Sequence, residues 1–172
     1  LLDDLLAYSR AGRHLHKPEW IDTEELVRDV TYLLAPPPGF VLDVCSPLPK
    51  VFGERVPLET VLRNLIGNAI KHHDHPETAR VEVAASESDG FVEFVVADNG
   101  PGIEAAHHDR IFQVFQTLKP RDQVEGSGMG LAVVKKIVEN QGGRILLTSA
   151  PGQGATFCFT WPQVKGAEGV SG

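Results

Sequence analysis

Two asparagines and two basic residues lie on one side of a segment with helical spacing. Asn64, Asn68, Lys71 and His72 follow one another at intervals of four, three and one residues, so they share one arc of a helix. Asparagine weakens a helix interior, and two of them one turn apart cost stability without a local gain. An amide oxygen can ligate Mg²⁺, and a nearby ammonium can offset phosphate charge. The arc therefore predicts a site for a Mg²⁺-bound polyphosphate, or else an ordinary solvated helix face.

A glycine-rich segment, Asp98-Asn99-Gly100-Pro101-Gly102-Ile103, follows a run of strand-like alternation. Two glycines two residues apart permit backbone angles that are closed to other residues and let the chain approach a ligand. An acid at a strand end can accept a hydrogen bond from an exocyclic amine such as adenine N6. The same residue types are also common in ordinary strand-end turns. Taken alone, this segment leaves both interpretations open.

A second glycine-rich segment, Gly126-Ser127-Gly128-Met129-Gly130-Leu131, stands directly before a predicted helix. Unpaired N–H groups at a helix start form a cradle for an anion. The Gly-x-Gly-x-Gly spacing matches neither the dinucleotide fingerprint nor the P-loop. A flexible linker is the alternative, and the firm helix pattern that follows favours phosphate binding.

The elements that must position these residues alternate between helices and hairpins. Asp22 or Thr23 can cap a helix that Pro36 ends, and Asp89-Gly90 predicts a hairpin turn. The predicted helices are 1–10, 23–33, 57–72, 105–112 and 128–140, and the predicted strands are 40–45, 51–52, 80–86, 91–97, 144–150 and 155–161. This order favours an α+β fold in which helices cover one face of a mainly antiparallel sheet.

The composition fits one domain that binds no nucleic acid. The chain has 172 residues and a net charge of −7, so a general nucleic-acid surface is not expected. No apolar stretch approaches the roughly 20 residues of a membrane-spanning helix. Cys45 and Cys158 lack metal-ligand spacing and are expected to be reduced thiols. The chain opens on Leu1 within a leucine pattern, so we expect a piece of a longer protein.

The three motifs in this order resemble those of the ATP-binding catalytic domain of bacterial sensor histidine kinases, in the GHKL superfamily. The matching segments are Asn64–His72 (N box), Asp98–Gly102 and Gly126–Leu131 (Gly boxes), Arg110–Phe115 (F box) and Gly152–Phe157 (the terminal Gly-Thr-Phe hairpin). The resemblance implies a Bergerat-type two-layer α/β sandwich. It also implies that 1–13 ends a dimerisation and phosphoacceptor helix, that 14–18 is a linker, that 19–162 binds ATP, and that 163–172 is a disordered tail.

The same resemblance implies the site residues and two cofactors, ATP and Mg²⁺. Asn68 would ligate Mg²⁺, Asp98 would read the adenine amine, and Thr156 would support the base from the sheet. The implied ATP site comprises Asn64, Asn68, Lys71, His72, Asp98, Gly100, Gly102, Ile103, Gly126, Ser127, Gly128, Met129, Gly130, Leu131 and Thr156. Residues 116–127 would form a lid anchored by Phe112 and Phe115, with Lys119 or Arg121 reaching the terminal phosphates. His72 replaces a common aromatic residue, and Gln116-Thr117 replaces a common arginine.

The chain shows no histidine in the family's phosphoacceptor pattern, which continues with an acid and then a proline. His14 is followed by Leu15, and His108-Asp109 is followed by Gln113 where the proline belongs. The acceptor would therefore lie in the phosphoacceptor helical domain of the same parent. The parent would be a cytoplasmic or membrane-anchored homodimer that passes phosphate to a response-regulator receiver domain, and this piece alone would be a monomer.

Three alternatives remain open. A GHKL clamp ATPase would need a catalytic acid on the N-box helix, where Glu59 lies well before Asn68, and an anti-sigma serine kinase would lack the 1–13 helix. A module without catalysis could sense nucleotide or dock partners. The histidines of 72–75 could bind a metal or form a solvated helix end.

Overall fold

The computed structural model describes residues 2–11, 13, 17–113 and 130–163. Its main element is a five-stranded sheet with the order β2-β4-β5-β7-β6. The strands are β2 (Val41–Val44), β4 (Arg80–Ser88), β5 (Phe91–Asp98), β6 (Ile145–Ser149) and β7 (Ala155–Pro162). Only the β2–β4 pair of this sheet is parallel. The mixed, mainly antiparallel sheet confirms the predicted α+β class.

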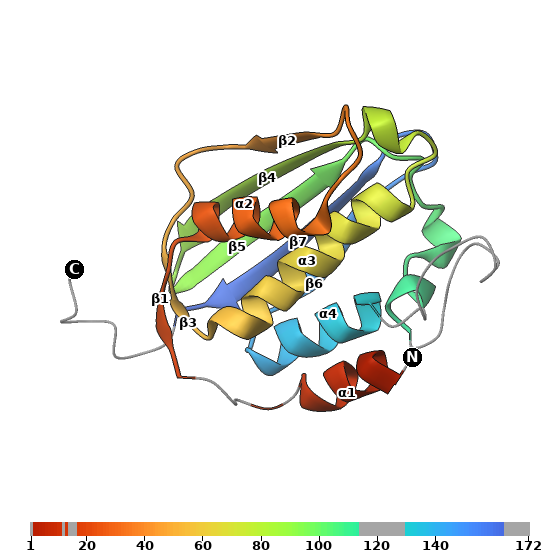
Figure 1. Cartoon of the computed structure of the whole chain (residues 1–172). Helices are drawn as coiled ribbons and strands as arrows, with labels where there is room; N and C mark the ends of the chain where they lie inside the picture. The colour runs from red at the N-terminus through yellow and green to blue at the C-terminus, as the bar shows by residue number, and fades with distance from the viewer. Residues whose placement is uncertain (1, 12, 14–16, 114–129, 164–172) are drawn as a thin grey trace.

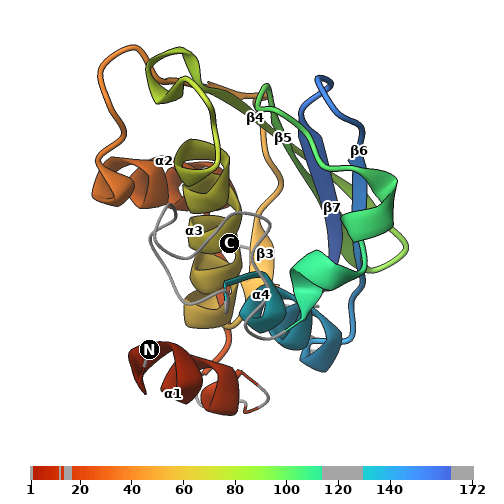
Figure 2. The same ribbon diagram turned by 90° about the vertical axis from the view of Figure 1, so that its right-hand side faces the viewer.

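Helices cover one face of this sheet and give the domain two layers (Figures 1 and 2). They are α2 (Thr23–Leu34), α3 (Arg55–Lys71) and α4 (Gly130–Asn140), and α1 (Leu2–Arg10) lies beside α4. The two-layer arrangement agrees with the expected α/β sandwich. Among the described residues, no helix is both long and apolar enough to cross a membrane.

Helix α2 begins at the predicted residue and ends within one residue of the predicted end. Asp22 is the N-cap of α2, because its side chain accepts the Glu25 N–H at 3.0 Å. Ala35 adopts a left-handed conformation (φ 47°) just before the prolines and ends that helix. The predicted apolar arc of α3 packs on the sheet, and its buried members include Leu58, Leu62, Leu65, Ile66 and Ala69. The polar arc of α3 lies on the side of the helix that faces away from the sheet.

Strand β7 shows which face of the sheet the helices cover. Its buried positions are Ala155, Phe157, Phe159 and Trp161, and the positions between them are only half-buried. On the buried face Phe159 stacks on Phe94 with ring centroids 4.9 Å apart. Because side chains alternate along a strand, the intervening residues lie on the outer face of the sheet.

Two local features differ from the prediction. A short strand, β1 (Glu19–Ile21), pairs with β3 (Val51–Gly53), and Trp20 packs on Phe52 with centroids 5.3 Å apart. Three residues are too few for a visible alternation, so the sequence did not predict β1. The predicted helix 105–112 is instead two 3₁₀ turns, Ala105–His107 and Arg110–Phe112. Between them, His108 Nε2 lies 2.9 Å from the Ile103 carbonyl oxygen and ties the segment back to the preceding loop.

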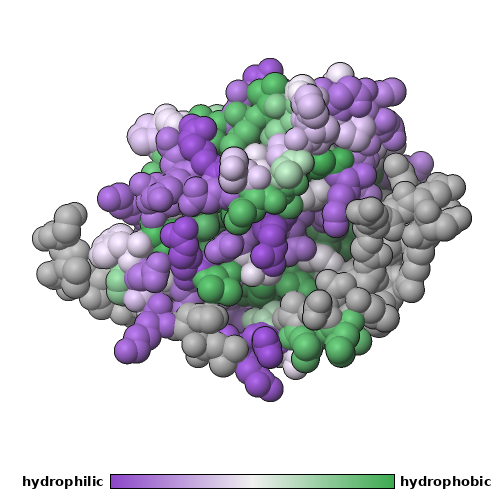
Figure 3. All heavy atoms as spheres, in the orientation of Figure 1, coloured by the Kyte–Doolittle hydropathy of each residue, from purple (hydrophilic) through white to green (hydrophobic). Residues whose placement is uncertain are grey.

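Helix α1 contacts the domain through α4. Lys136 Nζ donates to the Tyr8 carbonyl at 2.8 Å and lies 4.2 Å from the centroid of the Tyr8 ring. Leu2, Leu5 and Leu6 are exposed on α1, where Figure 3 shows an apolar patch.

Candidate functional site

The N-box helix and the start of α4 meet at one side chain. Asn64 Nδ2 donates to the Thr60 carbonyl at 2.7 Å, so the amide is held in one orientation. Its Oδ1 faces Gly130, where an added Cβ would lie only 2.9 Å from that oxygen. Gly130 is the first residue of α4, and the N–H groups of the first turn of a helix have no partner within the helix. The structure thus brings an amide oxygen and a helix N-terminus together.

The remaining polar residues of the N box lie along the same helix. Asn68 is half-buried and Lys71 is exposed. His72 caps the C-terminus of α3, where its backbone N–H donates to the Asn68 carbonyl at 3.0 Å. These residues therefore offer an amide oxygen, an ammonium and an imidazole on the side of α3 that faces away from the core.

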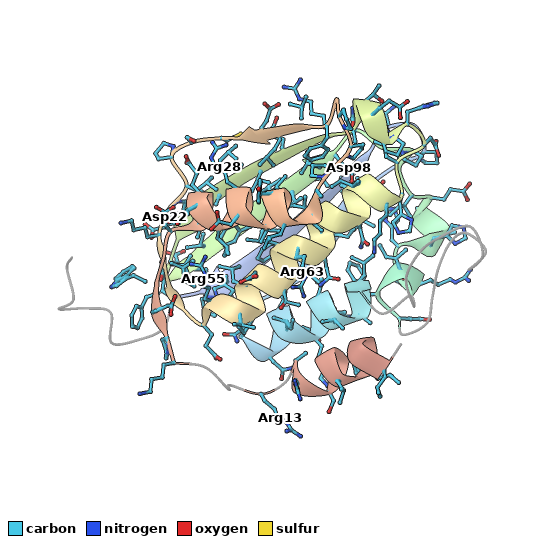
Figure 4. All side chains as sticks on the ribbon, in the orientation of Figure 1. Arg13, Asp22, Arg28, Arg55, Arg63 and Asp98 are labelled. Atoms are coloured by element: carbon cyan, nitrogen blue, oxygen red, sulfur yellow. The ribbon has the colours of Figure 1, made fainter. Side chains whose placement is uncertain are left out.

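Asp98 ends β5 and is labelled in Figure 4. Its Oδ1 accepts the Gly100 N–H at 2.8 Å and the Ala155 N–H at 3.2 Å. Burial raises the pKa of this carboxyl, and the two backbone N–H bonds oppose that increase. Among the described residues nothing hydrogen bonds to Oδ2, so this oxygen can accept a donor from a ligand.

Gly102 and Gly154 pack two loops together. Gly102 (φ 78°) lies against the Ala150 carbonyl and Gly154 (φ 70°) against the Asp98 carbonyl, and a Cβ at either position would clash with that backbone. The Gly152 N–H also donates to the Pro101 carbonyl at 2.7 Å. Gly102 was expected to line the adenine, and the structure shows that its missing Cβ leaves room for the Ala150 carbonyl.

Ser149 strengthens the same contact and was not predicted from the sequence. Its Oγ accepts the Ile103 N–H at 2.8 Å and donates to the Gly154 carbonyl at 2.6 Å. Ser149 pairs with Ala155 across β6 and β7 and so lies on the helix-facing side of the sheet. The sequence signal that could have found it is a serine at a strand position whose neighbours two residues away are apolar.

Thr156 does not join the site. It pairs with Ala97 and belongs to the outer set of β7 positions, whereas Asp98 and Ala155 lie on the helix-facing side. The expectation that its side chain supports the base is therefore wrong. Ala155, the neighbouring residue on the helix-facing side, donates its backbone N–H to Asp98.

Part of the predicted site lies outside the described residues: Phe115, Lys119, Arg121, Gly126, Ser127, Gly128 and Met129. Of the described members, Gly130 and Leu131 begin α4, and Leu131 is half-buried. Phe112 packs edge-on against Phe157 with centroids 6.2 Å apart, and the lid that it was expected to anchor lies outside the described residues.

The histidines after α3 do not present a metal site. No group of three His, Cys, Asp or Glu side chains in the described part of the chain could hold a metal ion. His73 Nδ1 accepts the His75 N–H at 2.9 Å, and its Nε2 lies 3.0 Å from Asn99 Oδ1. Hydrogen bonds thus occupy both ring nitrogens. The amide oxygens of Asn64 and Asn68, by contrast, are hard oxygen donors of the kind that suits Mg²⁺ beside phosphates.

Comparison with known proteins identifies the family. A model described as histidine kinase-, DNA gyrase B- and HSP90-like ATPase matches residues 53–165. The phytochrome-like protein Cph1 of Synechocystis is 35% identical over 165 residues, which cover 94% of this chain and 22% of Cph1. This chain therefore belongs to the family of histidine kinase-, DNA gyrase B- and HSP90-like ATPases.

Solved structures agree with this assignment. Full-length ShkA in complex with AMPPNP has a TM-score of 0.77 and 32% identity, covering 94% of this chain and 35% of that one. The mycobacterial sensor histidine kinase MprB has a TM-score of 0.69 and 28% identity, covering 84% of this chain and 97% of that one. Within the family, the fold is that of the histidine kinase catalytic domain. The chain spans about a fifth of the length of the curated relatives it matches.

Proposed function

We propose that this chain binds Mg²⁺-ATP between α3, α4 and the end of β5. The observation that carries the proposal is the meeting of Asn64 Oδ1 with Gly130, the first residue of α4. This contact places an amide oxygen, which can ligate a metal ion, beside a helix N-terminus, where phosphate binds readily. The ShkA structure, which contains AMPPNP, supports the choice of nucleotide.

Each described residue has a role that follows from its place. Asp98 would accept the adenine amine through Oδ2, the oxygen that neither Gly100 nor Ala155 uses. Asn68 would ligate Mg²⁺ with Asn64 beside it, and Mg²⁺ would neutralise phosphate charge. Lys71 and His72 would face the phosphates from the C-terminal turn of α3. Residues 116–127 would form a lid over the bound nucleotide.

The parent protein would be a sensor histidine kinase. Its reaction would move the γ-phosphate of ATP to a histidine of the phosphoacceptor helical domain, and then to an aspartate of a response-regulator receiver domain. This chain would supply positioning and charge neutralisation, the main protein contributions to phosphoryl transfer. We also propose that residues 1–13 end the dimerisation helix, that the parent is a cytoplasmic or membrane-anchored homodimer, and that this chain alone is a monomer.

Two measurements test the proposal. Calorimetric titration with AMP-PNP should show saturable binding that strengthens when Mg²⁺ is added. Incubation with labelled ATP should leave no acid-labile phosphate on the chain, because the acceptor histidine lies elsewhere. Absence of saturable binding would favour a docking module, and strong labelling of this chain alone would contradict the assigned role.

A further inference from the structure

A hydrogen bond between His73 and Asn99 joins the end of α3 to the loop that carries Asp98. His73 Nε2 and Asn99 Oδ1 are 3.0 Å apart. The backbone N–H of His75 donates to His73 Nδ1 at 2.9 Å, so Nδ1 carries no proton. The donor to Asn99 is therefore Nε2–H, and these two hydrogen bonds fix the orientation of the ring.

Asn99 is itself hydrogen bonded to the first residue of β4 and to the turn before that strand. Its Oδ1 also accepts the Arg80 N–H at 2.8 Å, and its Nδ2 donates to the Thr78 carbonyl at 3.1 Å. Its own N–H lies 3.3 Å from the Arg80 carbonyl oxygen. Asn99 thus extends the β4–β5 pairing one residue beyond Asp98, and His73 attaches this end of the sheet to the segment that follows the N-box helix.

The ring of His73 lies beside the residue that orients Asp98. A Cβ added to Gly100 would be 3.8 Å from His73 Cδ2 and 3.0 Å from Asp98 Oδ1. The Gly100 N–H donates to that same oxygen at 2.8 Å. Removal of the His73 ring would leave Asn99 with only its bonds to Thr78 and Arg80 and would open space beside Gly100. The Gly100 N–H could then shift, and the carboxylate that accepts it would shift too.

We propose that His73 is a positioning residue for base recognition: through Asn99 and Gly100 it holds the Asp98 carboxylate where it accepts an exocyclic amine. Adenine carries such an amine at C6. Guanine carries a carbonyl there, whose oxygen would face the carboxylate and be repelled. This inference rests on the proposed nucleotide site and assigns to His73 the discrimination between the two bases at that site.

The test compares AMP-PNP with GMP-PNP, each with Mg²⁺, by calorimetric titration of the whole chain. His73→Ala should weaken AMP-PNP binding about fivefold, the size of one neutral hydrogen bond. It should change GMP-PNP binding little, so the preference for adenine falls. His73→Gln should restore most of the preference, because its amide nitrogen can donate from near the Nε2 position.

A matched control and a double variant make the test specific. His75→Ala removes an exposed ring that lies 3.8 Å from Glu77 and keeps the backbone N–H that His73 uses, so nucleotide binding should not change. In an Asn99→Ala background, His73→Ala should weaken AMP-PNP binding little further, because both variants break the same bridge.

Three outcomes would overturn the inference. One is a His73→Ala chain with wild-type affinity and preference. Another is a His73→Gln chain as impaired as His73→Ala, which would indicate a purely structural role. A wild-type chain that binds neither nucleotide would overturn the proposed function, and this inference with it.

Discussion

Asn64 and Gly130 lie against each other although 65 positions separate them in the sequence, and an added Cβ on Gly130 would come within 2.9 Å of Asn64 Oδ1. The absence of a side chain at Gly130 therefore leaves room for the amide oxygen at the start of α4. Because Gly130 has no positive φ that would favour glycine, we expect that space to serve the proposed binding site and not the fold.

Gly130→Ala should separate binding from stability. Alanine favours a helix by up to about 1 kcal/mol over glycine, so the free energy of unfolding should stay the same or rise. The methyl group would displace Asn64 Oδ1, and AMP-PNP affinity measured by calorimetry should fall about tenfold, or ~1.4 kcal/mol.

Gly67→Ala is the matched control for that variant. Gly67 is also helical, but its Cβ would meet Leu34 Cδ2 at an ordinary 3.5 Å. The change should stabilise the domain by roughly 0.5–1 kcal/mol in a urea melt without altering nucleotide affinity. Wild-type binding by Gly130→Ala would show that the contact with Asn64 has no role in the site.

Asn68→Asp and Asp98→Asn should abolish nucleotide binding in the same titration. The first adds a negative charge beside the phosphates. The second keeps an Oδ1 acceptor for the N–H groups of Gly100 and Ala155 but turns a donor toward the adenine amine.

The same two variants should fold normally without nucleotide. Their free energy of unfolding should stay within about 1 kcal/mol of wild type, because residues that line a solvent-filled site contribute little to the core. A large loss of stability in either variant would instead assign that residue to the structure.

Gly102→Ala should destabilise the domain strongly. Its Cβ would clash with the Ala150 carbonyl at a positive φ, so the two loops could not pack as they do. Gly152→Ala has a nearly equal φ (76° against 78°) and nothing within 4 Å of its Cβ. It should therefore cost only the backbone strain, on the order of 1 kcal/mol. Equal melting temperatures for the two variants would contradict this account of the loop contact.

Asp98 should make stability depend on pH with a defined sign. Its pKa in the folded chain is raised above the ordinary aspartate value of 3.8, mainly by burial. The folded state therefore favours the protonated acid, and this contribution is present below the unfolded pKa and is lost as pH rises through the folded pKa. In denaturant melts across this window, wild type should lose stability relative to Asp98→Asn as pH rises. An opposite slope would show that the N–H bonds outweigh burial.

The features with local causes were predictable from the sequence. Asp22 and the prolines after Ala35 define α2, and the apolar arc from Leu58 to Ala69 defines the buried side of α3. The hairpin at Asp89-Gly90 follows from two residues that tolerate positive φ (48° and 82°). In each case a few residues close together in the sequence were enough to predict the element.

The face assigned to Thr156 was wrong because motif similarity took precedence over strand periodicity. Phe157, Phe159 and Trp161 have the same parity as Ala155, and a shift of one residue moves a side chain to the other face. The alternation therefore already contained the correct answer.

Contacts between distant segments were beyond prediction. Neither the bonds of Ser149 to the Gly102 loop nor the bridge from His73 to Asn99 follows from local spacing, because the packing of separate elements decides them. Both depend on where β6 and the end of α3 lie in the folded domain.

Helix α4 joins two contacts that were described separately. Gly130 touches Asn64 at its first residue, and Lys136 touches Tyr8 six residues later, about 9 Å along the axis. Both contacts lie on one continuous 11-residue helix. Any tilt of α4 about Gly130 would therefore also displace Lys136 and alter its contact with α1.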